Sequence, residues 1–313
     1  MTAGTTDTYD QIGIREDLSD VISNISPEEV PFYSNCSKED VTNTLFEWQT
    51  DSLAAVDTDT AIEGADATFA PASPTTRLNN VTEIIEKTAA VSGTVEATDR
   101  AGRAREMAYQ ILKRAKELRR NAEHHLVGIS QAAVAGSDSL ARKTASLQTW
   151  MATNTSRGVG GADPAGDGSN TPTDGTQRAF TEALLGAVID SIYVEGGNPD
   201  VLMANAFNKR AITGFSGNAD EVKHNNTDKT VINAVSVYVS DYNTISVVPN
   251  RFLRARDVLV LEMDYWSVGV LRPLQNMEIA RTGDAEKRQV LMEYGLCAKQ
   301  EASSGIVADL TTS

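Results

Sequence analysis

A long amphipathic helix is the feature that most restricts how this chain can fold. Small, apolar and histidine side chains recur at spacings of four and three, which places them on one face of an α-helix. The stripe consists of Ala104, Ala108, Ile111, Ala115, Leu118, Ala122, His125 and Ile129. With Thr98 or Asp99 as the N-cap, the pattern predicts a helix over residues 98–136, about 50 Å long at 1.5 Å per residue. Because small residues dominate the stripe, we expect the helix to pack closely on a sheet or another rod.

The faces of this helix that point away from the stripe are basic. Lysine and arginine gather between Arg100 and Arg120, and only Glu106 and Glu117 oppose them. The chain as a whole carries a formal net charge of −15. Such a summed charge repels nucleic acid, because phosphate binding needs clustered positive charge. We therefore expect the protein to tolerate DNA nearby without binding it tightly.

The N-terminal third predicts two projecting parts. Residues 1–40 have scattered apolar positions followed by prolines, which favours a short helix and then an extended arm. In residues 41–95, Phe46 and Trp48 alternate with polar residues before a polar tip, and a second β-rich run follows. These residues predict a long β-hairpin, with Phe46 and Trp48 as its anchor on the body or on a neighbouring subunit.

The remaining sequence completes an α+β fold class. Residues 159–175 are rich in Gly, Asp, Pro and Thr and predict a flexible loop. Residues 180–195 predict a second amphipathic helix that stops at two glycines. A buried strand within residues 200–204, a hairpin over residues 235–250 and strands within 257–271 and 288–301 follow from alternating or continuous apolar runs.

Acidic residues dominate the stretch from Glu39 to Asp66, which leads into the outer half of the predicted hairpin, and no lysine or arginine appears from Glu39 until Arg77. They are Glu39, Asp40, Glu47, Asp51, Asp57, Asp59, Glu63 and Asp66. One interpretation is a solvated loop, and the other is a surface that meets a basic partner. Asp57 and Asp59 form a DxD, but the glycine and glutamate of a calcium loop are missing, so no metal site is predicted.

The residues that usually bind metals or form disulfides show no matching pattern. His124, His125 and His224 fit no HExxH spacing, and two adjacent histidines on a helix point in different directions. Cys36 and Cys297 lie at opposite ends of the sequence and predict buried free thiols. No metal and no cofactor is expected.

Enzymatic motifs are equally absent. The glycines of residues 159–175 have no Walker lysine, and the sequence around Ser216 lacks the second glycine of a nucleophile elbow. A soluble hydrolase that uses Asp241, Asp264 or His224 is the alternative from another class. The absence of a catalytic pattern favours a protein that is not an enzyme and whose projecting parts contact copies of itself.

Membrane association is not expected. No apolar run approaches the roughly 20 residues that a bilayer requires, and the first residues lack the basic start and apolar core of a signal peptide. These features predict synthesis and retention in a cytoplasm.

Nearly the whole chain resembles the major head proteins of tailed bacteriophages that adopt the fold first described for phage Hong Kong 97. The similarity rests on FEWQTDSLAA, EGADA, RLNNVTEIIEKTAAVSGT, RAREMAYQILKRAKELRRNAE, VSDYNTISVVPNRF and RTGDAEKRQVLMEYGL. In that family, an N-terminal arm and an extended loop reach over neighbouring subunits. A spine helix and a long sheet form a peripheral domain, and an axial domain meets its mates at the centre of each capsomer.

The resemblance implies a division of this chain into an N-terminal arm (1–40), an extended loop (41–95), a peripheral domain (96–195, with the spine helix at 98–136), an axial domain (196–272) and the C-terminal strands of the peripheral domain (273–313). Only about 40 residues precede the loop. A fused scaffolding segment is therefore expected to be absent or already removed, in which case scaffolding comes from another protein or is not needed.

The resemblance implies a major capsid protein that assembles into hexamers and pentamers of an icosahedral or prolate head around double-stranded DNA. The implied partners are copies of itself, a portal, and separate scaffolding or decoration proteins, in a virion assembled in the host bacterial cytoplasm. The alternative within the same fold is the shell of an encapsulin-like nanocompartment, which encloses an enzyme instead of a genome.

The opposite charges of loop and helix suggest a contact between subunits. In this interpretation the acidic loop of one subunit lies across the basic helix of the next. The alternative is that the helix charges pair locally with Glu106 or Glu117. The candidate interface residues are Phe46, Trp48, Asp51, Asp57, Asp59, Glu63, Asp66, Arg114, Arg119 and Arg120.

Overall fold

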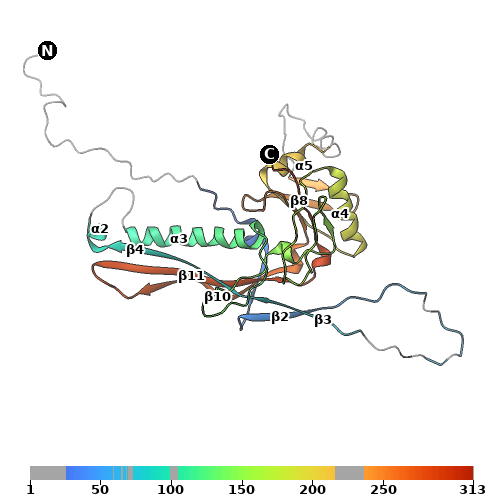
Figure 1. Ribbon diagram of the computed structural model, residues 1–313, viewed down its shortest axis with the longest axis horizontal. Coiled ribbons are helices and arrows are strands. Elements are labelled where there is room, and N and C mark those ends of the chain that lie inside the picture. The colour runs from blue at the N-terminus through green and yellow to red at the C-terminus, as the bar shows by residue number, and fades with distance from the viewer. Residues whose placement is uncertain are drawn as a thin grey trace, which may run out of the picture.

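The chain has an α+β fold with three sheets, in which an elongated part and a more compact part are joined (Figure 1). The computed structural model describes residues 26–58, 60–64, 66–67, 69, 73–98, 105–215 and 236–312. Its α-helices are α1 (Pro31–Asn35), α2 (Gly93–Ala97), α3 (Glu106–Glu123), α4 (Glu182–Val194) and α5 (Ala206–Thr213). Its strands are β1 (Ser37–Asp40), β2 (Leu45–Thr50), β3 (Thr76–Val81), β4 (Glu83–Ser92), β5 (Thr155–Ser156), β6 (Val201–Ala204), β7 (Val237–Val239), β8 (Thr244–Pro249), β9 (Val258–Leu261), β10 (Trp266–Ile279), β11 (Ala285–Ala298) and β12 (Gly305–Val307). A π-helical turn (His124–Gly128) and three short 3₁₀ turns (Leu147–Thr149, Met263–Tyr265 and Glu301–Ser303) complete the list.

The elongated part is a four-stranded sheet with the order β1-β10-β11-β4. β10 and β11 form a long antiparallel hairpin, and α3 runs beside β4 (Figure 1). The face of α3 that packs inward includes Met107, Ile111, Leu118 and Ala122. Because these residues are spaced by four, seven and four, they form one stripe, as helical periodicity requires. Ala108, which the sequence pattern placed in this stripe, is exposed.

The compact part is a six-stranded sheet with the order β5-β12-β9-β6-β8-β7. β6 and β9, in the middle of the sheet, are buried along their whole length, which explains why both read as continuous apolar runs. Leu185, Val188 and Ile192 of α4 pack on one face of this sheet together with Ile212 of α5. A first, larger core joins the other face to the elongated part and contains Trp150 and Trp266.

The helix predicted over residues 98–136 is shorter than expected at both ends. Thr98 does not start it: Thr98 ends α2, and its hydroxyl donates to the carbonyl of Thr94 at 2.7 Å. The described part of α3 begins at Glu106, and residues 99–104, with Ala104 of the stripe, lie outside the described residues.

The C-terminal end of the helix is set by a contact with a distant segment. At Ile129 the backbone is extended, with φ −129° and ψ 154°. A Cβ on Gly128 would lie 2.3 Å from the carbonyl oxygen of Phe252, so the helix ends where another backbone approaches it. The carbonyl of Val127 accepts from the backbone N–H of Arg254 at 3.3 Å, which satisfies one of the helix's terminal acceptors.

The predicted hairpin of residues 41–95 is in fact divided between two sheets. β2 pairs only with β3, in a two-stranded ribbon from Leu45↔Val81 to Thr50↔Thr76. After the single residue Thr82, the chain continues as β4 and pairs with β11. The projecting element is therefore β2, β3 and the described residues of the loop 51–75, which extend far from the body (Figure 1).

The sheets and cores also cross two of the domain boundaries that the resemblance implied, namely the boundary between residues 195 and 196 and the boundary between residues 272 and 273. α4 belongs to the core of the compact part, and β12 returns from the C-terminal region to the same sheet. β10 lies across the second division and belongs to the elongated sheet from Trp266 onward. The physical reason is that sheet membership depends on strand pairing between distant segments, which a linear division of the sequence ignores.

Candidate subunit-contact surfaces

Glu123, at the end of α3, holds the start of α1. Its carboxylate accepts the backbone N–H groups of Phe32 at 2.9 Å and Tyr33 at 2.7 Å, and the side-chain amide of Asn250 at 2.6 Å. Those N–H groups belong to the first turn of α1 and have no acceptor within that helix. Glu123 is fully buried, and this burial raises its pKa although the three hydrogen bonds lower it. A side chain 90 residues away in sequence thus replaces the missing N-cap of α1.

The segment before α1 lies against the same helix. Lys116 of α3 forms an ion pair with Glu28 at 2.8 Å, and the ring of Phe32 packs edge-on to Trp266 at 6.5 Å between centroids. The described part of the predicted arm is therefore attached to the body of its own chain. Residues 1–25 of the arm lie outside the described residues.

Phe46 and Trp48 anchor the ribbon on the body of their own chain. A Cβ on Gly295 would lie 2.5 Å from the ring of Phe46, so the absence of a side chain there makes room for it. Gly269, directly opposite Gly295 in the β10–β11 register, contributes to the same seat. The indole N–H of Trp48 donates to the carbonyl of Ala298 at 2.7 Å, and its ring lies 5.3 Å from that of Trp150.

A buried carboxylate fixes the bend between β3 and β4. Glu293 of β11 accepts the hydroxyl of Thr82 at 2.8 Å and pairs with Arg142 at 2.5 Å and Arg272 at 2.8 Å. Arg142 also donates to the carbonyl of Thr82 at 3.2 Å. Burial alone would raise the pKa of Glu293, but the hydrogen bonds and the two guanidinium charges outweigh it and hold the pKa below its usual value. The root of the ribbon is therefore held rigidly. Sequence reasoning missed this group because its members come from four distant segments.

We expect Trp48→Ala to loosen the ribbon at its root. The change removes the contact with Trp150 and leaves the carbonyl of Ala298 without its donor, at a cost of about 2 kcal/mol or more in the free energy of unfolding. Assembly should suffer further, because the loop then leaves the body in no fixed direction. Thermal unfolding of the unassembled protein and particle yield by sedimentation measure the two effects, with Trp48→Phe as the control. Normal values of both for Trp48→Ala would contradict this role.

The loop of residues 51–75 exposes both acidic and apolar side chains. Asp51, Asp57, Glu63 and Asp66 are exposed and form no ion pair with the described residues, while Asp59 lies outside that part of the chain. Leu53, Val56, Ile62 and Phe69 are each more than 80% exposed, at 98%, 104%, 83% and 95%. Sequence reasoning singled out the acids and missed these apolar residues. Their spacing is irregular, so no periodicity marks them.

Two other acidic residues of this stretch are paired within the chain, while Asp40 is exposed and forms no ion pair with the described residues. Glu47 pairs with Arg77 across the ribbon, and Glu39 of β1 pairs with Lys299. Within this stretch, the acids that form no ion pair with the described residues therefore lie mainly in the loop of residues 51–75.

The basic face of α3 is partly neutralised in the same way. Arg114 pairs with Glu117 at 2.7 Å, which is the local pairing that the sequence left as an alternative. Arg120 lies over the ring of Phe252 with its Cζ 5.6 Å from the centroid. Arg119 is exposed and has no ion pair among the described residues. The structure thus separates the three arginines by their contacts and leaves Arg119 as the most available charge.

The described residues contain no group of three His, Cys, Asp or Glu side chains that could hold a metal ion. His125 pairs with the buried Glu83, and His124 is exposed. Cys36 and Cys297 are buried and free, as predicted, and burial raises their pKa values to about 12 and about 11. Low thiolate content makes both poor nucleophiles.

The residues of the alternative hydrolase site are not assembled by contacts within the described chain. Asp241 lies in the β7–β8 turn, Asp264 lies in the short turn before β10, and His224 lies outside the described residues. Within the described ranges, every helix is too short or too polar to cross a bilayer.

Comparison with solved structures shows the same fold in the capsids of a phage and of a GTA particle. The chain matches the capsid of cyanophage A-1(L) with a TM-score of 0.67 at 15% identity, over 97% of this chain and 98% of the other. It matches a capsid subunit of a native GTA particle with a TM-score of 0.62 at 11% identity, over 97% and 98% of the two chains. This places the chain in the Hong Kong 97-like fold that the resemblance implied.

Sequence comparison identifies the family. The chain is 29% identical over 342 aligned residues to the major capsid protein of Escherichia phage Phieco32, covering 96% of this chain and 95% of that protein. The model of the SU10 major capsid protein family matches residues 1–311. The loop, arm and helix described above therefore belong to a phage shell subunit: the chain is a member of the SU10 major capsid protein family.

Proposed function

We propose that this capsid protein self-assembles into hexamers and pentamers that close into an icosahedral or prolate head around a double-stranded DNA genome. The observation that carries the proposal is the projecting loop of residues 51–75. Its root is held rigidly by Phe46, Trp48 and the Glu293 group, yet its apolar residues have no cover from their own chain. A projection that is fixed at its root and carries uncovered apolar side chains is suited to another subunit's surface.

The chemistry of the loop suits the basic face of a neighbour's α3. Exposed ion pairs contribute only about 0–1 kcal/mol each, and burying one large apolar side chain contributes about 1.5–3 kcal/mol. Leu53, Val56, Ile62 and Phe69 would therefore supply most of the contact energy. The acids Asp51, Asp57, Asp59, Glu63 and Asp66 would select the place, with Arg119 as the main cation and Arg114 and Arg120 beside it.

In this proposal the two parts of the body have different roles in the shell. The elongated sheet with α3 acts as the peripheral domain, and the compact sheet with α4 and α5 acts as the axial domain. The arm (1–40) and the loop reach neighbouring subunits. Weak contacts let misplaced subunits detach, and repetition over a closed shell makes the total binding energy large.

The proposed partners are those that a closed, DNA-filled shell requires. They are further copies of this chain, a portal, and separate scaffolding or decoration proteins. DNA is enclosed without sequence-specific binding, since the net charge of −15 disfavours a tight grip on phosphate. The protein acts as a structural component and not as an enzyme, in a virion assembled in the bacterial cytoplasm.

Particle formation by the purified protein tests the proposal. We expect size-exclusion chromatography and negative-stain microscopy to show closed particles of uniform size, with or without an added scaffolding protein. The proposal would be contradicted by a monomer or small oligomer that never forms shells, even when the other proteins of the same virion are co-expressed with it. Turnover of hydrolase substrates that is lost in Asp241→Asn or Asp264→Asn would favour the enzyme instead.

A further inference from the structure

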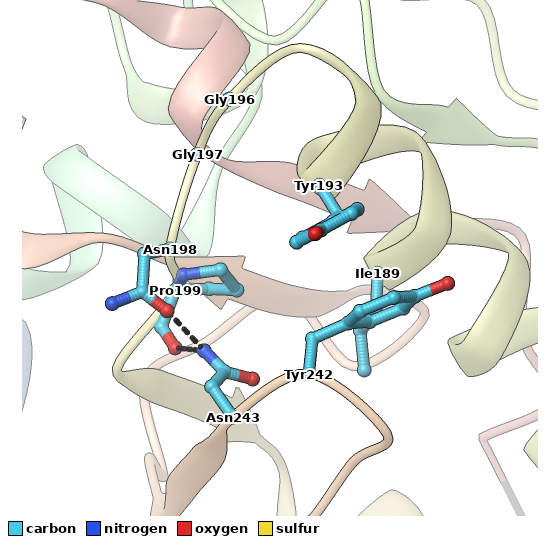
Figure 2. A pocket seen from close by; sticks show the side chains of 8 residues that line it. All are labelled: Ile189, Tyr193, Gly196, Gly197, Asn198, Pro199, Tyr242 and Asn243. Atoms are coloured by element: carbon cyan, nitrogen blue, oxygen red, sulfur yellow. Dashed lines mark hydrogen bonds between the residues drawn. The ribbon is translucent and has the colours of Figure 1, made fainter.

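The compact sheet has one acidic, aromatic end. β6 and β8 are parallel, so the residues before them, Asn198 and Pro199 on one side and Tyr242 and Asn243 on the other, meet at the same end of the sheet. The C-terminal part of α4 reaches this end and adds Tyr193 (Figure 2). The side-chain amide of Asn243 donates to Asn198 Oδ1 at 2.9 Å and to the carbonyl of Pro199, which ties the two loops together (Figure 2).

Two exposed tyrosines stack on each other at this end. The rings of Tyr193 and Tyr242 lie 4.2 Å apart at an angle of 15°, and the side chains are 57% and 47% exposed. They border a pocket of 210 Å³ (Figure 2). A second hollow beside Tyr242 runs along α4, and a Cβ added at Gly186 would point into open space there. The two hollows share Ile189 and Tyr242 in their walls, and we call them together the tyrosine groove.

The walls of this groove carry uncompensated negative charge. Glu182, Asp190 and Asp241 line it, and none of them pairs with a cation among the described residues. The hydrogen bond to Asp190 and the charge of that residue raise the pKa of Tyr242. Burial, together with the charges of Glu182 and Asp241, raises the pKa of Tyr238. Aromatic faces beside carboxylates are the surroundings that a guanidinium group prefers.

The opposite end of the same sheet is basic. α5 follows β6, and Arg251 follows β8 after a single residue, so both lie at the C-terminal ends of these parallel strands. Arg210 of α5 and Arg251 are exposed, and neither forms an ion pair with the described part of the chain. The guanidinium of Arg210 lies over the ring of Phe207, 5.7 Å from its centroid. This end therefore presents arginine and an aromatic ring to the outside.

We infer that the acidic tyrosine groove of one subunit receives the α5 end of the next subunit in the same capsomer, with Arg210 and Arg251 as the cations. Complementary charges at opposite ends of one sheet favour a head-to-tail contact, and a head-to-tail contact that repeats by rotation closes into a ring. Exposed Val237 and Val239 on the edge strand β7 would add apolar area beside the groove. The inference deepens the proposed shell function and rests on it.

Disulfide trapping in assembled particles tests this pairing. The variant Asp241→Cys/Arg210→Cys, and separately Asp241→Cys/Arg251→Cys, is assembled under reducing conditions and then oxidised. The native Cys36 and Cys297 are buried with raised pKa values and should not react. For at least one pair we expect a non-reducing gel to show a ladder that ends at five and six linked chains. Asp241→Cys alone is the control and should give no ladder.

The outcomes separate the inference from the function on which it rests. Particles without cross-links for either pair would overturn the groove assignment and leave the shell function intact. A band at the dimer only would show a two-fold contact and would also overturn it. Failure of the wild-type chain to form particles would contradict the shell function itself.

If the cysteine variants do not assemble, exchanging the charges between the two surfaces tests the same contact. We expect Arg210→Glu/Arg251→Glu to lose particles, and the same protein with Asp190→Lys/Asp241→Lys added to regain them. Asp138→Lys, at an exposed acid outside the groove, is the matched control and should assemble normally. Assembly of the arginine variant at the wild-type yield, or no recovery in the combined variant, would contradict the inference.

Discussion

Reversing the charge of the loop is expected to abolish assembly and to leave the unassembled subunit folded. In the variant Asp57→Lys, Asp59→Lys, Glu63→Lys and Asp66→Lys, a neighbour's basic helix would meet a basic loop. The described members of this set are exposed and unpaired, so the free energy of unfolding should change by less than about 0.5 kcal/mol. Sedimentation of particles and circular dichroism of the subunit measure the two quantities.

The same prediction applies to the partner surface, with a difference between its three arginines. Arg119→Glu should reduce assembly without loss of stability, because Arg119 is exposed and unpaired among the described residues. Arg114→Glu should instead destabilise the subunit, because Arg114 pairs with Glu117 on its own helix. Mixing the loop variant with Arg119→Glu should recover part of the particle yield at contacts where the reversed charges meet.

Salt provides an independent check on the charge pairing. The Debye length falls from about 10 Å at 0.1 M to about 3 Å at 1 M, so assembly of the wild type should weaken as salt rises. The loop variant should depend on salt less strongly or in the opposite direction. Normal assembly of the loop variant would contradict this pairing. It would show instead that the basic face of α3 is solvated and forms only local ion pairs.

Replacing Glu123 by alanine is expected to give the largest loss of stability of any single change proposed for this chain. The change leaves the N–H groups of Phe32 and Tyr33 and the amide of Asn250 without their acceptor in a fully buried site. Each unsatisfied buried polar group costs about 1–3 kcal/mol, so the free energy of unfolding should fall by about 3 kcal/mol or more. Chemical denaturation measures this change.

Glu123 also connects the arm to the body, which gives a second measurement. In Glu123→Ala, limited proteolysis should cut the chain near α1 much earlier than in the wild type. Glu123→Gln keeps one acceptor oxygen and should lie between the two. Glu117→Ala, on the same helix but partly exposed, is the control and should leave the arm protected. Unchanged stability and unchanged protection in Glu123→Ala would show that the arm is held by its apolar contacts alone.

Several local features could be predicted from the sequence because they depend on residues close together in the chain. The stripe of α3 marked a long helix packed on a sheet, the alternation around Phe46 and Trp48 marked a strand, and the continuous apolar run of Val201–Ala204 marked a buried strand. Family membership was also accessible, because sequence strings along nearly the whole chain carry the resemblance.

Other features were decided only in the tertiary structure. The helix ends at Gly128 because the backbone of Phe252 approaches it, and the run after Arg77 divides at Thr82 because β4 pairs with β11 and β3 does not. Charge counting along the chain likewise could not tell Arg119 from Arg114, since their difference lies in which side chain stands beside each one.

The sequence by itself determined the presence of the long helix, of the strand around Phe46 and Trp48 and of the buried strand Val201–Ala204, and it showed where opposite charges are concentrated. The tertiary structure decided which buried group each of those segments meets: Glu123 at the arm, Gly269 and Gly295 under Phe46, and Glu293 at the bend. The reason is physical: periodicity is imposed by the local geometry of the backbone and repeats within a few residues. A hydrogen bond or a close contact between residues 90 or 211 positions apart leaves no periodic trace in the chain.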